Sequence, residues 1–181
     1  MLINLPANLA ELLSQKGFSI DTSGSCMMME IDDYVKQAPH SNHIEVKDVC
    51  DIEQLRTWLD IVNAALFGCE LVTIEQFSDI LNLENSCFYL GILGGQAVTA
   101  CLTIINDDTS VLEMVATLKE YRRKGVATAT IDKALIDLHK KSIKTISLRA
   151  ETDGINVYRR MGFKECFVRT VAACDWGKRR K

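Results

Sequence analysis

One stretch, from Glu113 to Thr128, constrains the fold of this chain more than any other. The run from Val111 to Leu118 is apolar and rich in strand-forming residues, and a short basic turn with one glycine follows it. Beyond the turn, apolar residues recur at intervals of three and four, as on one face of an amphipathic helix. These residues are Ala127, Ile131, Ala134, Leu135 and Leu138. The stretch therefore predicts a strand, a tight turn and a helix in direct succession.

The turn before this helix has the composition of an anion site. The first turn of an α-helix leaves backbone N–H groups without partners, and the helix dipole adds partial positive charge there. Gly125 lets the backbone approach a ligand closely, and Arg122, Arg123 and Lys124 add full charges. A pyrophosphate is the ligand that such a turn would hold best. The other interpretation is a solvated loop that caps an ordinary helix.

Two short motifs extend this interpretation. The first is Arg122-x-x-Gly125-x-Ala127, and the second is the run from Tyr158 to Phe163, Tyr-Arg-Arg-Met-Gly-Phe. The first resembles the acetyl-CoA pyrophosphate loop of the GCN5-related N-acetyltransferases, the GNAT superfamily. The second resembles a later motif of that family, in which a helical tyrosine precedes Gly-Phe. Both occur in the family's order, with a helical and a strand pattern between them.

The resemblance covers roughly residues 43–174 and implies a mixed α/β sheet, with a GNAT acetyltransferase domain over residues 43–181. The expected order is one strand, two helices, three antiparallel strands, helix, strand, helix, strand. Gly94-Gly95 lies between two alternating runs and predicts a two-residue hairpin within this order.

The two helices after the first strand are predicted by their caps. Asp51 and Thr73 each stand three residues before a glutamine, which is the capping-box pattern. The resemblance implies that these helices lie over the acceptor side. Trp58 and Phe67, in this region, are expected in the core instead of in contact with substrate.

Residues 1–42 form an N-terminal extension that resembles the C-terminal end of a GNAT domain, followed by a linker. The run that begins at Leu13, Leu-Ser-Gln-Lys-Gly-Phe, is similar to the later motif, although chance similarity is the alternative. The family usually closes with two strands after Gly-Phe, and only one fits here. We therefore expect residues 1–31 to supply a helix and two strands, Phe18–Asp21 and Cys26–Ile31. They would pack on the domain in cis or across a homodimer.

Acyl transfer from a thioester to an amine needs a base, an oxyanion donor and a proton for the leaving thiolate. Tyr158 is the candidate general acid, because a phenol with a pKa of about 10 can protonate a nearby thiolate whose acid has a pKa of about 8.5. Glu113 is the candidate general base, acting through a water. The resemblance implies an oxyanion donor on the strand near Thr117. The competing roles are a packing residue for Tyr158 and a solvated carboxylate for Glu113.

The resemblance also implies that acetyl-CoA is held mainly by backbone N–H groups. The residues expected to contact it are Thr117, Arg122, Arg123, Lys124, Gly125, Val126, Ala127 and Thr128. Two departures weaken the match: Lys119 replaces the family's usual proline before the loop, and Glu151 replaces its common asparagine before the tyrosine.

The expected function is acetyl-CoA-dependent N-acetylation of a small-molecule amine or an exposed protein amine. The alternative is a catalytically weak CoA-binding or regulatory module, which the two departures favour. The formal net charge of −3 gives no electrostatic case for nucleic acid. The sequence has no apolar run of the roughly 18 residues that a membrane span needs.

Histidines and cysteines give no pattern of a metal site. His40 and His43 lack a third ligand at a recognisable spacing, and the seven cysteines include no Cys-x-x-Cys. Most of the cysteines lie in apolar runs and are expected to be small core residues with reduced thiols. Together with the lack of a basic-then-apolar leader, this favours a cytoplasmic protein without a metal.

Overall fold

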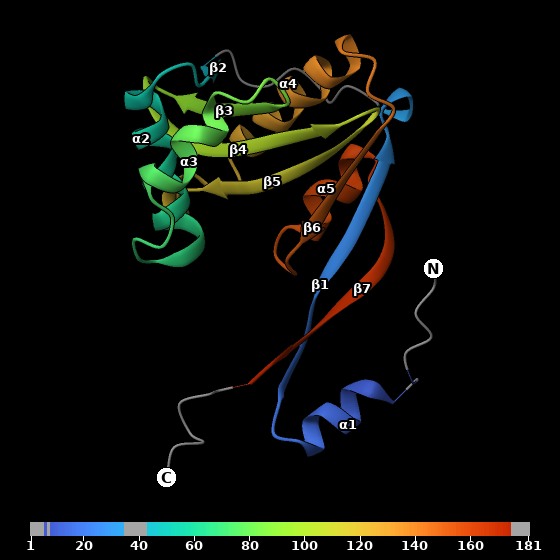
Figure 1. Cartoon of the computed structure of the whole chain (residues 1–181). Helices are drawn as coiled ribbons and strands as arrows, with labels where there is room; N and C mark the ends of the chain where they lie inside the picture. The colour runs from blue at the N-terminus through green and yellow to red at the C-terminus, as the bar shows by residue number, and fades with distance from the viewer. Residues whose placement is uncertain (1–5, 7, 35–42, 175–181) are drawn as a thin grey trace.

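The computed structural model describes residues 6, 8–34 and 43–174, which fold around a seven-stranded sheet (Figure 1). The strands are β1 (Ser19–Glu30), β2 (Ile44–Asp48), β3 (Ser86–Leu93), β4 (Gln96–Asn106), β5 (Thr109–Thr117), β6 (Thr145–Ala150) and β7 (Lys164–Ala173). The helices are α1 (Leu9–Gln15), α2 (Ile52–Val62), α3 (Ile74–Leu81), α4 (Val126–Lys140) and α5 (Ile155–Met161). Shorter helical turns are η1 (Ile31–Asp33), the π-helical η2 (Asn63–Phe67) and η3 (Lys119–Tyr121).

The strand order is β2-β3-β4-β5-β6-β1-β7. Strands β5 and β6 pair in parallel, and the other neighbours pair antiparallel. This mixed sheet with flanking helices confirms the predicted α/β fold class.

The helices α2 and α3 begin where their capping residues predict. The carboxylate of Asp51 accepts the backbone N–H of Gln54 at 2.8 Å, and the Gln54 side chain accepts the N–H of Cys50 at 2.7 Å. Thr73 and Gln76 form the corresponding capping box of α3. At each helix start the N-cap side chain thereby satisfies the backbone N–H of the third helical residue, Gln54 in α2 and Gln76 in α3.

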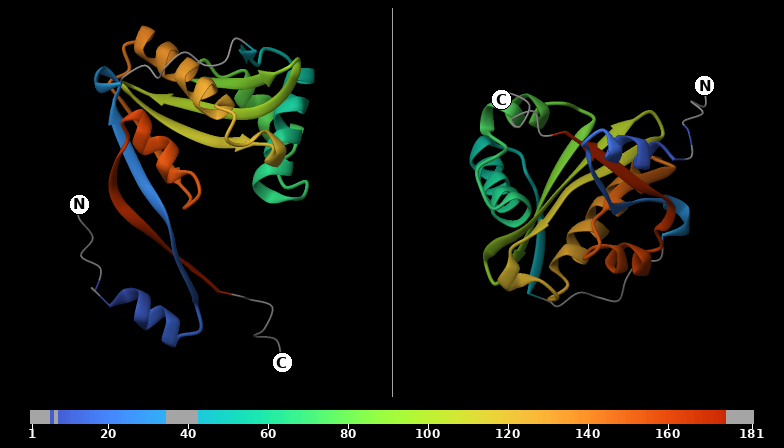
Figure 2. Two further views of the ribbon diagram at one scale, coloured as in Figure 1. Left: turned by 180° about the vertical axis from the view of Figure 1, so that it is seen from behind. Right: turned by 90° about the horizontal axis from the view of Figure 1, so that it is seen from below.

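Both helices cover one face of β3, β4 and β5 (Figures 1 and 2). Trp58 is fully buried there, with its ring centroid 5.0 Å from that of Phe88, as expected of a core residue. Phe67 instead ends η2 with 37% of its surface exposed, so the expectation of a core position is wrong for Phe67. The π-helical turn widens the end of α2 and directs this ring outward.

The β3–β4 hairpin turns at Gly94 and Gly95, whose φ values of 60° and 85° match the turn predicted for two glycines. On the other face, α4 packs directly on β3 at Gly91. A Cβ atom built on Gly91 would lie 2.3 Å from Thr130 Oγ1 and 2.9 Å from Val126 Cγ1. The missing side chain of Gly91 therefore determines how closely the first turn of α4 approaches the sheet.

The N-terminal strand β1 lies between β6 and β7, and pairs with both. Ser25, for example, lies opposite Ala150 on one side and Val168 on the other. The strand that the family usually has in addition to β7 is therefore supplied by β1 of the same chain. Where two strands were expected, the structure has one strand of 12 residues. A register shift between Asp21 and Gly24 lies where the two expected strands would have been separated, and β7 continues alongside it.

Two apolar clusters hold the sheet on its two faces. The first joins α4 and α5 to β1 and β6, and its fully buried members include Met27, Ile131, Leu135, Leu138, Ile146 and Met161. The second lies under α2 and α3, and it includes Leu55, Trp58, Val62, Phe88, Leu102 and Ala116. The predicted core face of α4 is thus confirmed for Ile131, Ala134, Leu135 and Leu138, whereas Ala127 is only half-buried.

The outer halves of β1 and β7 leave the body of the molecule as a two-stranded arm, and α1 lies at its far end (Figures 1 and 2). Helix α1 has no buried residue. Just before the arm, where β1 still pairs with β6, Phe167 and Val168 of β7 are 63% and 61% exposed.

The cysteines are free, but they are not mainly core residues. Cys101 is buried, whereas Cys50, Cys69 and Cys166 are exposed. The prediction that most would be core residues is wrong, because Cys101 alone of the seven is buried.

Candidate active site

The sheet opens between β5 and β6. These strands pair in parallel from Thr109 and Thr145 as far as Leu112 and Leu148, and there the ladder ends. Strand β5 nevertheless continues to Thr117. The β6 side of residues 113–117 therefore has no partner strand among the described residues, and its backbone groups form no ladder hydrogen bonds on that side.

A β-bulge lies at the start of this unpaired segment. Ala100 faces Ala116 and Leu102 faces Glu113, so one residue of β4 spans two residues of β5. Within the bulge Met114 has a φ of 53°, a left-handed conformation that is strained for a residue with a side chain. The carbonyl of Cys101, opposite the bulge, accepts the buried Trp58 Nε1–H at 3.0 Å. Trp58 thereby gives the Cys101 carbonyl a hydrogen bond at the point where the bulge disturbs the β4–β5 ladder.

The basic turn after β5 presents a row of free N–H groups. Among the described residues, the backbone N–H groups from Arg123 to Thr128 donate to no acceptor. Gly125 caps α4 with a φ of 82°, and Arg123 has a φ of 61°. Successive N–H groups with alternating conformations form a concave anion site, and α4 adds the positive end of its dipole.

The side chains around this turn are arranged less simply than the sequence suggests. Arg122 turns back, with Nε 3.2 Å from the carbonyl of Thr117 and Nη2 3.4 Å from that of Ala65. Arg122 thus ties the loop to β5 and η2, and contributes charge indirectly. Lys124 lies over the Tyr121 ring, with Nζ 4.9 Å from its centroid. Arg122 and Lys124 are thus engaged by neighbouring groups, whereas within the described part of the chain the backbone N–H groups of the turn are not.

Thr117 lies at the end of the unpaired part of β5. Its hydroxyl lies 3.1 Å from the hydroxyl of Thr99, within hydrogen-bonding distance. The opening of the sheet begins before Thr117, at the bulge. Sequence reasoning therefore named the end of the segment and missed Met114, because the run around it contains no glycine or asparagine to indicate a left-handed residue.

Tyr158 extends from α5 into the first apolar cluster, and only 7% of its surface is exposed. Its ring packs against Phe163 at 5.8 Å between centroids, and Gly154 leaves room for the ring edge. Burial raises the pKa of the Tyr158 hydroxyl, and Cys101 and Glu113 add to the increase. Within the described part of the chain this hydroxyl has no hydrogen-bond partner. The hydroxyl therefore stays protonated at neutral pH.

Glu113 lies just beyond the last β5–β6 pair and forms an ion pair across the opening. Its Oε2 is 3.3 Å from Nη2 of Arg149, the residue that follows the end of the ladder on β6. Glu113 is 27% exposed and Arg149 is 53% exposed. The structure thus brings Glu113 and Tyr158 to the same opening, and adds Arg149, which sequence reasoning missed.

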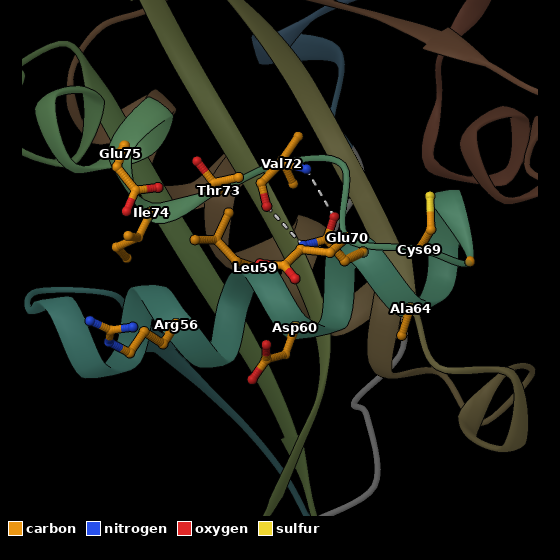
Figure 3. A pocket seen from close by; sticks show the side chains of 12 residues that line it. Arg56, Leu59, Asp60, Ala64, Cys69, Glu70, Val72, Thr73, Ile74 and Glu75 are labelled. Carbon is orange, nitrogen blue, oxygen red and sulfur yellow. Dashed lines mark hydrogen bonds between the residues drawn. The ribbon is translucent and has the colours of Figure 1, made fainter.

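A hollow of about 640 Å³ lies elsewhere, between α2 and the chain that leads into α3 (Figure 3). Arg56, Asp60 and Glu75 line it, and Asn63 spans its floor through hydrogen bonds to Val72. None of the predicted site residues borders this hollow.

The described residues contain no group of three or more potential metal ligands. In the same part of the chain, no helix has the length and apolar character to cross a membrane.

Comparisons with known proteins agree with this geometry. The model of the acetyltransferase (GNAT) domain matches residues 84–165, which contain the opening, the basic turn and Tyr158. No curated protein matches the sequence significantly.

Among solved structures, the chain is similar to a GCN5-related N-acetyltransferase from Kribbella flavida, with 19% identity over 92% of this chain and a TM-score of 0.69. It is also similar to one from Sphaerobacter thermophilus, with 18% identity over 92% of this chain and a TM-score of 0.76. The chain spans 63% and 55% of the lengths of these two proteins, respectively.

A crystal structure of a predicted acetyltransferase from Clostridium acetobutylicum with acetyl-CoA is similar as well. Its identity is 17%, its TM-score is 0.59, and the match covers 68% of this chain and 91% of the other. At such identities the likeness is one of fold. The match of the family model over residues 84–165 and the likeness of fold both support the GCN5-related N-acetyltransferase superfamily.

Proposed function

We propose that this protein transfers the acetyl group of acetyl-CoA directly to a primary amine of a small molecule or a protein. The observation that carries the proposal is the opening between β5 and β6, which ends at the free N–H groups of Arg123–Thr128. An elongated ligand with a pyrophosphate at one end fits this arrangement, because its chain can pair with β5 while the phosphates bind the turn.

The residues present fit the cofactor. A Cβ atom at Gly125 would have only Ile44 Cδ1 near it, at 4.0 Å, so the space beside the turn is open to phosphates. Acetyl-CoA, when bound, supplies the thioester. Backbone N–H groups near Met114 and Val115 are the best oxyanion donors, since the bulge frees them from the ladder.

Glu113 and Tyr158 would handle the protons. Glu113 accepts the proton of the ammonium, directly or through a water, so that the nitrogen can attack the acetyl carbon. As the C–S bond breaks, Tyr158 donates its proton to the sulfur. The raised pKa of Tyr158 keeps the proton on the phenol until negative charge develops on the sulfur. The proton therefore moves to the sulfur only after the C–S bond is largely broken.

The alternative, a CoA-binding module with weak or no catalysis, has one observation in its favour. The carboxylate of Glu113 is engaged by Arg149, and would have to leave this pairing to act as a base. Turnover separates the two functions: the enzyme releases free CoA thiol when given acetyl-CoA and a panel of amines. A binding module is stabilised thermally by CoA but releases no thiol beyond the rate without amine.

A further inference from the structure

The ion pair between Glu113 and Arg149 lies on a sheet face that helices leave open. Glu113 is opposite Leu102, which belongs to the cluster under α2 and α3. Arg149 alternates with Leu148 and Ala150, which face the other cluster, so Arg149 points to the same side as Glu113. Helices α2 and α3 cover this side over β3 to β5 but not over β6, β1 and β7 (Figures 1 and 2).

Exposed apolar side chains flank the ion pair on this face. Val111 and Met28 share a row with Ser147, and they are 37% and 42% exposed. Arg149 shares the next row with Cys26 and the exposed Phe167. The face therefore combines one anion, one cation and an apolar floor, beside the point where the acetyl group would be transferred.

The ion pair between Glu113 and Arg149 contributes little to the stability of the fold. It is a single contact between two partly exposed groups, and such pairs contribute little to stability. It does hold two opposite charges ready at the reaction centre. A ligand with both an ammonium group and a carboxylate could replace each partner of the pair with an opposite charge of its own.

We propose that the acceptor is an amine that also carries a carboxylate and an apolar side chain, as an apolar α-amino acid does. Arg149 binds the carboxylate, Glu113 takes the proton of the ammonium, and Val111 and Met28 contact the side chain. The nitrogen forms the bond to the acetyl carbon, the C–S bond breaks, and Tyr158 protonates the thiolate. This inference rests on the proposed acetyltransferase function, and it assigns Arg149 as the residue that determines acceptor specificity.

The test compares acceptors that differ only in the carboxylate. At saturating acetyl-CoA, kcat/KM is measured for phenylalanine against 2-phenylethylamine, and for leucine against isoamylamine. The wild-type protein should prefer the amino acid of each pair. Arg149→Met should lower this ratio at least about tenfold, because a charge-assisted hydrogen bond to the carboxylate is lost.

The ratio isolates the carboxylate contact, since damage to Glu113 or to the fold affects both acceptors of a pair. Arg149→Lys keeps the charge and should retain part of the preference. Arg56→Met is the matched control, because Arg56 is an exposed arginine of α2 that pairs with Glu53 and borders the separate hollow instead of the Glu113–Arg149 pair. The ratio for Arg56→Met should equal that of wild type.

Three results would overturn the inference: no preference for the amino acids in wild type, an unchanged ratio in Arg149→Met, or no acetylation of either amino acid. If the two amines without a carboxylate are still acetylated, the proposed function stands and only the acceptor assignment fails. If CoA binds and no amine is turned over, both fail, and the protein is a binding module.

Discussion

Replacing Gly91 with alanine should displace the first turn of α4, and with it the anion site. The new Cβ would lie 2.3 Å from Thr130 Oγ1, 2.9 Å from Val126 Cγ1 and 3.1 Å from Thr99 Cβ. Contacts this short force α4 away from β3, since Val126 and Thr130 are buried and cannot move to solvent. Overpacking of a core by one methyl group typically costs about 1–3 kcal/mol.

The assay is urea unfolding of the wild-type and Gly91→Ala proteins, followed by thermal unfolding with and without CoA. For a chain of this size, about 1–3 kcal/mol lowers Tm by roughly 2–12 °C. Because Val126 begins α4, the stabilisation by CoA should also fall, which a purely structural defect far from the site would not produce.

A double-mutant cycle identifies the clash. Thr130→Ala removes the closest atom, Oγ1, and also its hydrogen bond of 2.9 Å to the Val126 carbonyl. In the wild-type background it should destabilise, whereas in the Gly91→Ala background the loss should be smaller by about 0.5–3 kcal/mol. Equal effects in both backgrounds, or an unfolding free energy of Gly91→Ala equal to that of wild type, would refute the reasoning.

Three further predictions concern the cofactor site, the acid and the N-terminal strand. Gly125→Glu should abolish the stabilisation of about 2.7 kcal/mol that CoA gives at 100 times its Kd, because a carboxylate would face the phosphates; thermal shifts as large as those of wild type would mean that CoA binds elsewhere. Tyr158→Phe should lower kcat by on the order of 10²–10⁴-fold with nearly unchanged CoA affinity, and an unchanged rate in single-turnover experiments would leave Tyr158 a packing residue. Deleting residues 1–30 should give an aggregating protein, because Met27 and Met29 are almost fully buried and their partners on β6 would be exposed. In the intact protein, rapid hydrogen exchange throughout Cys26–Glu30 would contradict the interior position of β1.

The parts of the fold that could be predicted from the sequence are those determined by near neighbours in the chain. The caps at Asp51 and Thr73 and the turn at Gly94-Gly95 each involve a few consecutive residues, whose preferences act locally. The buried face of α4 follows from its periodicity for the same reason.

The features that could not be predicted depend on residues distant in sequence. The bulge at Met114 is fixed by β4 and Trp58, and nothing in its own composition favours a positive φ. The ion pair of Glu113 with Arg149 exists because the β5–β6 ladder ends where it does. Gly91 is an intermediate case. A glycine within a strand often marks a place where another element packs closely on the sheet, but the sequence does not reveal that this element is α4.

The position of β1 between β6 and β7 has a consequence for how the molecule folds. Its strand is synthesised before most of the domain, but its partners are near the other end, as the pairing of Ser25 with Ala150 and Val168 demonstrates. The strand β1 therefore cannot pair with β6 and β7 until nearly all residues of these two strands have left the ribosome. Its apolar methionines remain exposed to solvent during that time. Such long-range pairing slows folding and prolongs exposure to aggregation. Refolding rates should thus be limited by the docking of this strand onto β6 and β7.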